Sequence, residues 1–304
     1  MTGSTAPSRP PGGPPPPGPH HPSGSDRAPG ARVRPFLTAS WRHLLMLNYP
    51  VDPALLRPLV PAGTELDSFR GVTHISMVGF LFLDTRVMGV PVPGHRDFEE
   101  VNLRFYVRRR APDGWRRGVV FVRELVPRRA IAWIARRVYG EPYLAVPMSH
   151  RADVGPRGYV GVGGRVAYAW RFQDRWHRMS AVVHTEPRLA EEGSEPHFIT
   201  EHYWGYTARA DGTSAEYQVT HPRWRVSTLR DAKLDIDAAA LYGRDFADAL
   251  SAAPVSAFLA DGSPISVLRM STIHQTHTQI AFAPKVTEVR APQPSSANTA
   301  ARID

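Results

Sequence analysis

One segment of the chain carries several side chains that could do chemistry together. Residues 97–110, DFEEVNLRFYVRRR, alternate polar and apolar residues with the period of two that is typical of a β-strand. The four polar side chains that this pattern places on one face are Glu100, Asn102, Arg104 and Tyr106. Because Glu100 and Arg104 would lie roughly 13 Å apart along a strand, they could bind opposite ends of a small polar ligand. In that arrangement Arg104 would bind a carboxylate or oxyanion, and Glu100 would move a proton.

Two interpretations of this polar face are open. An antiparallel sheet usually packs one face and wets the other, so the polar residues could simply face water. Residues 73–84, THISMVGFLFLD, and 118–122, GVVFV, are however apolar on both faces, which predicts strands that are covered on both sides. A polar face inside a covered sheet must be hydrogen-bonded or line a cavity, because a buried unpaired charge costs several kcal/mol. The second interpretation therefore predicts a cavity for a small-molecule ligand.

The neighbouring strand should bring a further charged side chain to the same face. Strands over 98–110 and 115–126 are separated by APDG, which predicts a hairpin. With an even number of loop residues Arg123 would share the face of Asn102, and with an odd number Glu124 would, because a one-residue slip exchanges the faces. The sequence leaves this choice open, so both residues are candidates for the site.

Many further strands and few helices are expected around this hairpin. Asp52 as a cap, Pro53 at the first helical position and Pro61 as a stop predict a short helix after a strand at 41–49. The segment RRAIAWIARRVYG also has helical spacing of its apolar residues. Further strands are expected at 143–150, 158–172, 176–186, 214–221 and 264–270, and helices near 195–203 and 237–250. This content predicts an α+β, β-rich fold in which a curved antiparallel sheet forms a partly closed barrel.

Composition limits the classes of partner. The chain has 304 residues, a formal net charge of +9 and a pI near 10.2, which would suit a polyanionic partner. Lys233 and Lys285 are the only lysines among 37 cationic residues, and a general bias towards arginine explains the charge equally well. The sequence contains no zinc-finger, helix-turn-helix or aromatic ribonucleoprotein pattern, so we expect no nucleic-acid partner.

The sequence also predicts the compartment and the division of the chain. It contains no cysteine and no apolar signal core, and its longest apolar run, around Ile75 to Leu83, is too short to span a bilayer. We therefore expect a cytoplasmic protein with no membrane partner. Residues 1–33, rich in proline and glycine, should form a disordered tail, and residues 291–304 a shorter flexible one. A single domain is expected over 34–290, and its oligomeric state, homo-oligomer included, stays open.

Several blocks of the chain, taken in order, resemble the domain-of-unknown-function 2071 family. They are WRHLLMLNYPVDPALLRPLVPAGTELDSFRG, ISMVGF, FEEVNLRFYV, RRGVVFVRELVPRRAIAWIAR, FITEHYWGYT and THPRWRV, and they run from about Trp41 to Val226. That family is distantly similar to the acetoacetate decarboxylases, which implies a cone-like antiparallel barrel with a central cavity. The resemblance makes Glu100 the natural counterpart of the decarboxylases' cavity glutamate, with Glu99 as the alternative. Their active-site arginine could correspond to Arg42 or Arg57.

The resemblance departs from the decarboxylases at their reactive amine. Their Schiff-base lysine lies in a strand-to-helix segment with a proline and two lysines, and VPRRAIAW looks like that segment with Arg128 and Arg129 in the lysine positions. A guanidinium stays charged and cannot form a Schiff base. Lys233 and Lys285 stand in segments that resemble no catalytic motif. Amine-dependent decarboxylation is therefore not expected.

Histidines give weaker signals. The pairs in HRMSAVVH and TIHQTH have spacings that place the two histidines on opposite faces of a strand, so we expect no metal site and no cofactor. These pairs are His177 with His184 and His274 with His277. His150 could project into the cavity or be a partner of Glu124, and His221 is expected to pack with Trp224 at the barrel end.

Together these patterns predict a small-molecule protein with an acetoacetate-decarboxylase-like fold. The expected catalytic residues are Glu100 and Arg104, and the expected ligand-binding residues are Asn102, Tyr106, Arg123 and Glu124. The chemistry would be acid/base rather than Schiff-base, in a lyase-like or hydrolase-like enzyme that acts on a small carboxylate or carbonyl compound. The alternative is a non-catalytic ligand-binding or scaffold protein that retains the barrel without the lysine.

Overall fold

Seven strands of the computed structural model, which describes residues 34–138 and 140–273, close into a ring. Neighbouring strands around the ring are antiparallel except β12 and β6, which run parallel. The ring closes where Val219 of β13 pairs with Val267 of β15. In ring order the strands are β13 (Ser214–Thr220), β12 (Trp204–Ala208), β6 (Gly114–Val126), β5 (Phe98–Ala111), β3 (His74–Val87), β1 (Leu37–Pro50) and β15 (Ser256–Val267).

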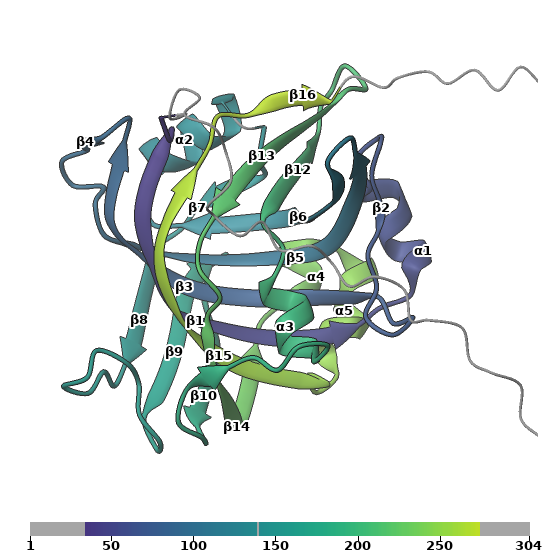
Figure 1. Ribbon diagram of the computed structural model, residues 1–304. Helices are drawn as coiled ribbons and strands as arrows, with labels where there is room; N and C mark the ends of the chain where they lie inside the picture. Colours follow the sequence, from purple (N-terminus) through teal and green to yellow (C-terminus); the bar gives the residue numbers. More distant parts are fainter. Residues whose placement is uncertain (1–33, 139, 274–304) are drawn as a thin grey trace, which may run out of the picture.

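A second group of strands continues the same sheet away from the ring. They follow β15 in the order β14 (Arg225–Asp235), β10 (Arg175–Val183), β9 (Arg165–Phe172) and β8 (Met148–Ala152). In Figure 1 the strands β8, β9, β10 and β14 extend below the ring. Five short strands complete the sheet, namely β2 (Glu65–Leu66), β4 (Val90–Pro91), β7 (Tyr143–Ala145), β11 (Arg188–Leu189) and β16 (Ser271–Ile273).

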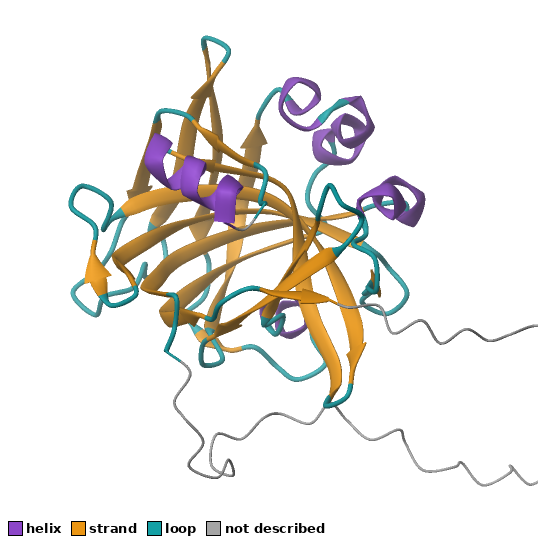
Figure 2. Cartoon of the chain, turned by 90° about the horizontal axis from the view of Figure 1, so that it is seen from above, coloured by secondary structure: helices purple, strands orange, loops and turns teal. Residues whose placement is uncertain are grey.

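The helices are short compared with the long strands of the curved sheet, as Figure 2 shows. They are α1 (Pro53–Leu56), the 3₁₀ turn η1 (Arg57–Leu59), α2 (Arg129–Val138), α3 (Glu195–Thr200), α4 (Ala238–Tyr242) and α5 (Arg244–Ser251). The expected cap of the first helix is present, because the Asp52 carboxylate accepts a hydrogen bond of 2.8 Å from the Ala54 N–H. Among the described residues no helix has the length and apolarity needed to span a bilayer.

Two apolar cores explain the strands that are apolar on both faces. Inside the ring, Leu44, Val78 and Phe80 belong to one buried cluster. On the outside, Met77 and Leu103 pack in a second cluster with residues of β9 and β10 and of helices α4 and α5. Strand β3 is therefore covered on both sides, and every residue from His74 to Phe82 is buried. The polar face of β5 points into the same interior as the first cluster, so it does not face bulk water.

The predicted fold class is confirmed, whereas several element boundaries are wrong. Strand β15 begins at Ser256 rather than near 264, and the strands β12 and β14 were not predicted. The helix expected over 237–250 is two helices, because Gly243 has a φ of 91° and interrupts the helical path. The expected tails, 1–33 and 291–304, lie outside the described residues.

Candidate active site

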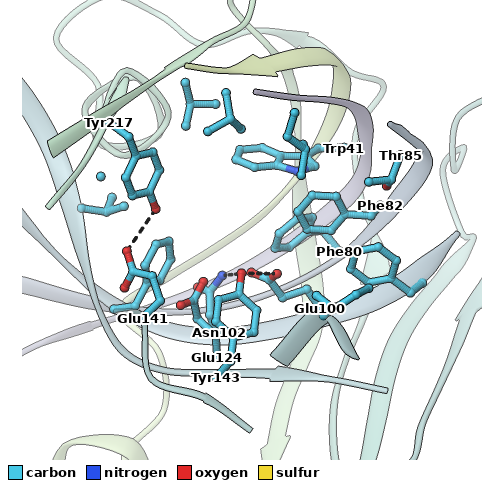
Figure 3. A pocket seen from close by; sticks show the side chains of 18 of the residues that line it. Trp41, Phe80, Phe82, Thr85, Glu100, Asn102, Glu124, Glu141, Tyr143 and Tyr217 are labelled. Atoms are coloured by element: carbon cyan, nitrogen blue, oxygen red, sulfur yellow. Dashed lines mark hydrogen bonds between the residues drawn. The ribbon is translucent and has the colours of Figure 1, made fainter. Parts of the chain in front are cut away.

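A cavity of about 210 Å³ lies inside the ring. Figure 3 shows that polar side chains gather on one part of its wall and that Trp41, Phe80 and Phe82 form another part. Phe98 and Leu44 add to the apolar wall, and residues of helix α2 and of the segment before β5 complete the lining. A cavity with a mostly apolar wall and a few convergent polar groups has the character of a small-molecule site.

Three glutamates dominate the polar part of the wall, and they come from three different segments of the chain. Glu100 lies on β5, Glu124 on β6, and Glu141 in the segment between α2 and β7. Their exposed fractions are 2%, 2% and 4%, so all three carboxyl groups have lost nearly all contact with bulk water. Buried carboxylates are unfavourable unless paired, which makes this cluster an unusual feature of an otherwise apolar interior.

The Glu100 carboxyl group is held by two neighbours. The Asn102 side chain donates to Oε1 at 3.0 Å, and the Tyr143 hydroxyl donates to Oε2 at 3.0 Å (Figure 3). Burial raises the pKa of Glu100 to about 7, against the opposing effects of these hydrogen bonds and of the Arg104 charge. Glu100 therefore takes both protonation states near neutral pH, which is the property that a general acid or base needs.

Glu141 and Glu124 share this environment. Thr207 and Tyr217 donate to Glu141 Oε1 at 2.7 and 3.3 Å, and burial nevertheless raises the pKa of Glu141 to about 8. Burial, together with the charges of Glu141 and Glu100, raises the pKa of Glu124 well above its usual range. Its Oε2 atom has no hydrogen-bond partner among the described residues. Mutual repulsion keeps the three groups from ionising together, so the cavity holds acidic protons at neutral pH.

A β-bulge decides which residue of β6 enters the cavity. The hairpin loop is even-numbered, since Ala111 pairs with Gly114, and a regular ladder would place Arg123 opposite Asn102. A register shift beside Leu103 adds one residue on β6, so Asn102 pairs with Glu124 instead. Glu124 consequently lies in the cavity. Of the two alternatives left open by the sequence, Arg123 is therefore the wrong one. It pairs with Leu103 on the outer face and does not line the site.

Arg104 stands further along β5 than Glu100 and Asn102. It is 9% exposed, and it makes no ion pair with any residue that the structure describes. Its Nε atom has no hydrogen-bond partner within that part of the chain, while one Nη lies 3.9 Å from the Met46 sulfur, a weak acceptor. A buried guanidinium with unused donors is suited to bind an anionic or carbonyl oxygen.

Tyr106 is on the expected face but does not line the cavity. Its hydroxyl lies 2.6 Å from the Ser76 hydroxyl, which in turn donates to Asn48 at 2.6 Å. The Arg104 guanidinium lies over the Tyr106 ring at 5.7 Å. Tyr106 therefore packs against Arg104. It was predicted to contact a ligand, but it lies behind the cavity wall instead.

His202 and Asp67 lie close to Tyr106 and were not identified from the sequence. His202 lines the cavity, and its Nε2 lies 3.2 Å from Asp67 Oδ2. Arg117 donates from Nε to the same oxygen at 2.7 Å. Both residues lie in blocks that the family resemblance contains, TELDSFRG and FITEHYWGYT, but no local pattern brings them together. Asp67 and His202 are 135 positions apart in the chain, and the ring topology brings them together.

The other candidates from the sequence lie elsewhere. His150 pairs with Glu99 at 2.7 Å at the surface rather than with Glu124. His221 stacks on Trp224 with ring centroids 4.0 Å apart, as expected. Buried His177 accepts a backbone N–H from Asp237. Among the described residues no group of three or more His, Asp or Glu could hold a metal ion. His274 and His277 lie outside the described residues.

The lysine needed for a Schiff base is not replaced within the part of the chain that the structure describes. Arg128 and Arg129, at the start of α2, are exposed. Lys233 is exposed on β14, and Lys285 lies beyond the described residues. Arg42 donates to the Gly262 carbonyl at 3.3 Å, and exposed Arg57 lies in η1. Neither Arg42 nor Arg57 lines the cavity. What the site offers is acidic protons from carboxyl groups and a guanidinium to bind an anion.

The ring, its outer layer and the enclosed cavity define an acetoacetate-decarboxylase-like fold. Acetoacetate decarboxylase from Legionella pneumophila superposes with a TM-score of 0.56 at 13% identity, over 81% of this chain and 92% of that one. The enduracididine biosynthesis enzyme MppR gives a TM-score of 0.57 at 14% identity, over 79% and 88% of the two chains. At these identities the likeness concerns the fold alone.

Sequence comparison then assigns the family. The model of the DUF2071 family, described as an uncharacterized conserved protein, matches residues 38–264. The protein YqjF of Bacillus subtilis (strain 168), also described as uncharacterized, is 30% identical over 202 residues, which are 66% of this chain and 78% of YqjF. The chain belongs to the DUF2071 family, and the predicted resemblance is confirmed.

Proposed function

We propose that the protein is a small-molecule enzyme that binds a small carboxylate or carbonyl compound in the ring cavity and moves a proton within it. The observation that carries the proposal is the meeting of three buried glutamates and a buried arginine that has no ion-pair partner among the described residues. Structural ion networks normally satisfy such groups, whereas perturbed pKa values in a cavity are typical of sites that transfer protons.

Each residue has a distinct task in this proposal. Arg104 binds the carboxylate or polarises the carbonyl oxygen, which stabilises negative charge that develops during the reaction. Glu100 donates or accepts the proton, because its pKa of about 7 gives both forms at neutral pH. Asn102 and Tyr143 hold the Glu100 carboxyl group in place. The apolar wall keeps water away, so these interactions are stronger than they would be in solvent.

The relatives support the chemical class of the ligand. The enzyme MppR, which shares the fold, has also been solved in complex with pyruvate, a small oxo-acid. In this chain the amine-dependent part of decarboxylase chemistry has no candidate, because Arg128 and Arg129 replace the expected lysines. The proposed chemistry is therefore proton transfer between carboxyl groups and ligand, without a covalent intermediate on lysine.

A non-catalytic ligand-binding protein is the second candidate, and the missing lysine is the observation that favours it. Such a protein would retain Arg104 as the anchor and use the glutamates only to select its ligand. The two candidates differ in their response to Glu100→Gln. An enzyme should lose turnover by about 100-fold or more, while a binding protein should change only in affinity.

The first test is ligand-induced thermal stabilisation of the full chain with small oxo-acids, lactones and aromatic carboxylates. We expect at least one acid to raise the melting temperature, and Arg104→Met to weaken its binding by about tenfold or more, since hydrogen bonds to a buried charge are lost. Arg110→Met is the matched control, because Arg110 is exposed on the same strand. Stabilisation that survives Arg104→Met would contradict the proposed site.

A further inference from the structure

The Asp67–His202 pair has a defined proton arrangement. Asp67 is 5% exposed, and its Oδ2 atom accepts from Arg117 while facing Nε2 of His202. Although burial opposes it, hydrogen bonds and charges from His202 and Arg117 lower the pKa of Asp67 to about 2, so Asp67 is a carboxylate. A carboxylate can only accept, so Nε2 of His202 carries the proton and Nδ1 is left as an acceptor.

The Nδ1 atom of His202 has no hydrogen-bond partner among the described residues. The residue is 8% exposed, and its ring is held by Tyr106 and Phe198 with centroids 4.7 and 4.9 Å away. Burial lowers the pKa of His202 to about 4, against the opposing hydrogen bond with Asp67, so the ring is neutral at physiological pH. His202 lines the cavity, and its Nδ1 is a neutral, buried acceptor without a partner among the described residues, so it is the group of this ring that a ligand donor would satisfy.

Arg104 offers the complementary donor beside this acceptor. The Arg104 guanidinium and the His202 ring both contact Tyr106, at 5.7 and 4.7 Å from its ring centroid. The charge of Arg104 also acts on His202. The donor and the acceptor therefore both lie close to the same aromatic ring, and both residues line the cavity. A ligand that satisfies both needs an anionic oxygen next to a hydroxyl group.

From this arrangement we infer that the ligand is a hydroxy acid, whose carboxylate binds Arg104 and whose hydroxyl group donates to His202 Nδ1. Asp67 is the residue that positions His202. The aromatic wall of Trp41, Phe80 and Phe82 would then contact an apolar substituent of the acid. The inference rests on the proposed function for Arg104, and it adds His202 as the residue that determines specificity.

Matched acids with and without the hydroxyl group test the inference. We would titrate the full chain calorimetrically with each enantiomer of mandelate against phenylacetate, and of lactate against propionate. One hydrogen bond to a neutral acceptor predicts a preference of about threefold to tenfold for the hydroxy acid in at least one pair. His202→Phe should abolish this preference while the plain acid still binds, and Asp67→Asn should reduce it.

Two further variants separate the possible outcomes. His202→Asn keeps an acceptor near the Nδ1 position and should restore part of the preference, which a merely structural role of the ring would not do. Arg104→Met should weaken both acids of a pair equally. Equal binding of the two acids to the wild type, or a preference that persists in a folded His202→Phe protein, overturns the inference and leaves the proposed function standing. Failure of these acids, and of every compound in the thermal-stabilisation screen, to bind the folded wild type overturns both.

Discussion

At the scale of single residues, the three buried glutamates carry most of the unusual chemistry. Burial raises the pKa of Glu100 to about 7 and that of Glu141 to about 8, and the pKa of Glu124 is raised well above its usual range. Such groups hold their protons in the folded state at a pH at which the unfolded chain has released them. The same arrangement that prepares proton transfer therefore makes the fold sensitive to pH.

The first prediction concerns Glu141→Gln. Because the folded-state pKa lies above the usual 4.5, the contribution of Glu141 to stability is complete below about pH 4.5 and is lost as the pH rises towards 8. Glutamine does not titrate, and its amide oxygen can still accept from Thr207 and Tyr217. At pH 9 we expect the variant to be more stable than the wild type by about 4 kcal/mol, or roughly 10 °C in melting temperature.

The same comparison at pH 5 should show little difference between Glu141→Gln and the wild type. Glu191→Gln, at an exposed position, serves as the control and should be neutral at both pH values. A stability difference that does not grow between pH 5 and pH 9 in calorimetric melts would argue against a raised pKa at Glu141.

Only part of the site could be predicted from the sequence. The period-two alternation correctly placed Glu100, Asn102 and Arg104 together, because a strand fixes its faces locally. The choice between Arg123 and Glu124 depended on a bulge, and a bulge leaves no clear mark in a single sequence. The remaining cavity residues come from distant segments, and nothing local encodes their approach.

At the scale of elements, strands β12 and β13 meet more closely than ordinary side chains allow. Gly205 pairs with Tyr217, and a Cβ atom at Gly205 would lie 2.2 Å from the Tyr217 ring. The missing side chain lets the tyrosine lie flat over β12, from where its hydroxyl reaches Glu141. Gly205 therefore positions the Tyr217 hydroxyl, which donates a hydrogen bond to the carboxyl cluster.

The second prediction follows from this close approach. Gly205→Ala should displace the Tyr217 ring, destabilise the protein by about 2 kcal/mol, and weaken the hydrogen bond to Glu141. Gly161→Ala is the matched control, since a Cβ atom there meets no atom within 4 Å. Urea denaturation of both variants would measure the effect, and equal stability of the two would show that Tyr217 moves aside at no cost.

The elements themselves were predicted unevenly. The long strands β1, β3, β5 and β6 were recovered, because each combines an apolar pattern with clear turn residues at its ends. Strand β14 was missed because it is largely exposed and charged, with the burial pattern of an outer strand. Its pairing with β10 and β15 fixes its conformation, and that information is absent from its own sequence.

At the scale of the whole molecule, the ring depends on a short seam between β13 and β15. Within the described part of the chain only two residue pairs join these strands, Val219 with Val267 and Thr220 with Ser266. Next to them, the Leu268 N–H donates to the Gln218 carbonyl at 2.9 Å. Tyr217 of β13 and Val267 of β15 both line the cavity, so the seam holds two of its walls together.

The third prediction addresses this seam. Leu268→Pro removes the N–H donor, so it should destabilise the fold by about 3 kcal/mol and reduce ligand binding along with stability. Leu268→Ala keeps the donor and controls for the loss of the side chain. Melting curves would measure both changes, and a Leu268→Pro protein as stable as Leu268→Ala would show that the seam contributes little.

Strands β1 and β15 are the first and last strands of the ring in the sequence, and they pair with each other. This pairing determines when β1 can complete its contacts during synthesis. Leu37 pairs with Val267, a separation of about 230 positions, so one edge of β1 has no native partner until nearly the whole domain has left the ribosome. At ordinary translation rates this takes roughly 10 to 50 s. During that time β1 exposes an apolar surface and unpaired backbone groups along one edge, the features that make a nascent chain prone to pair with other chains.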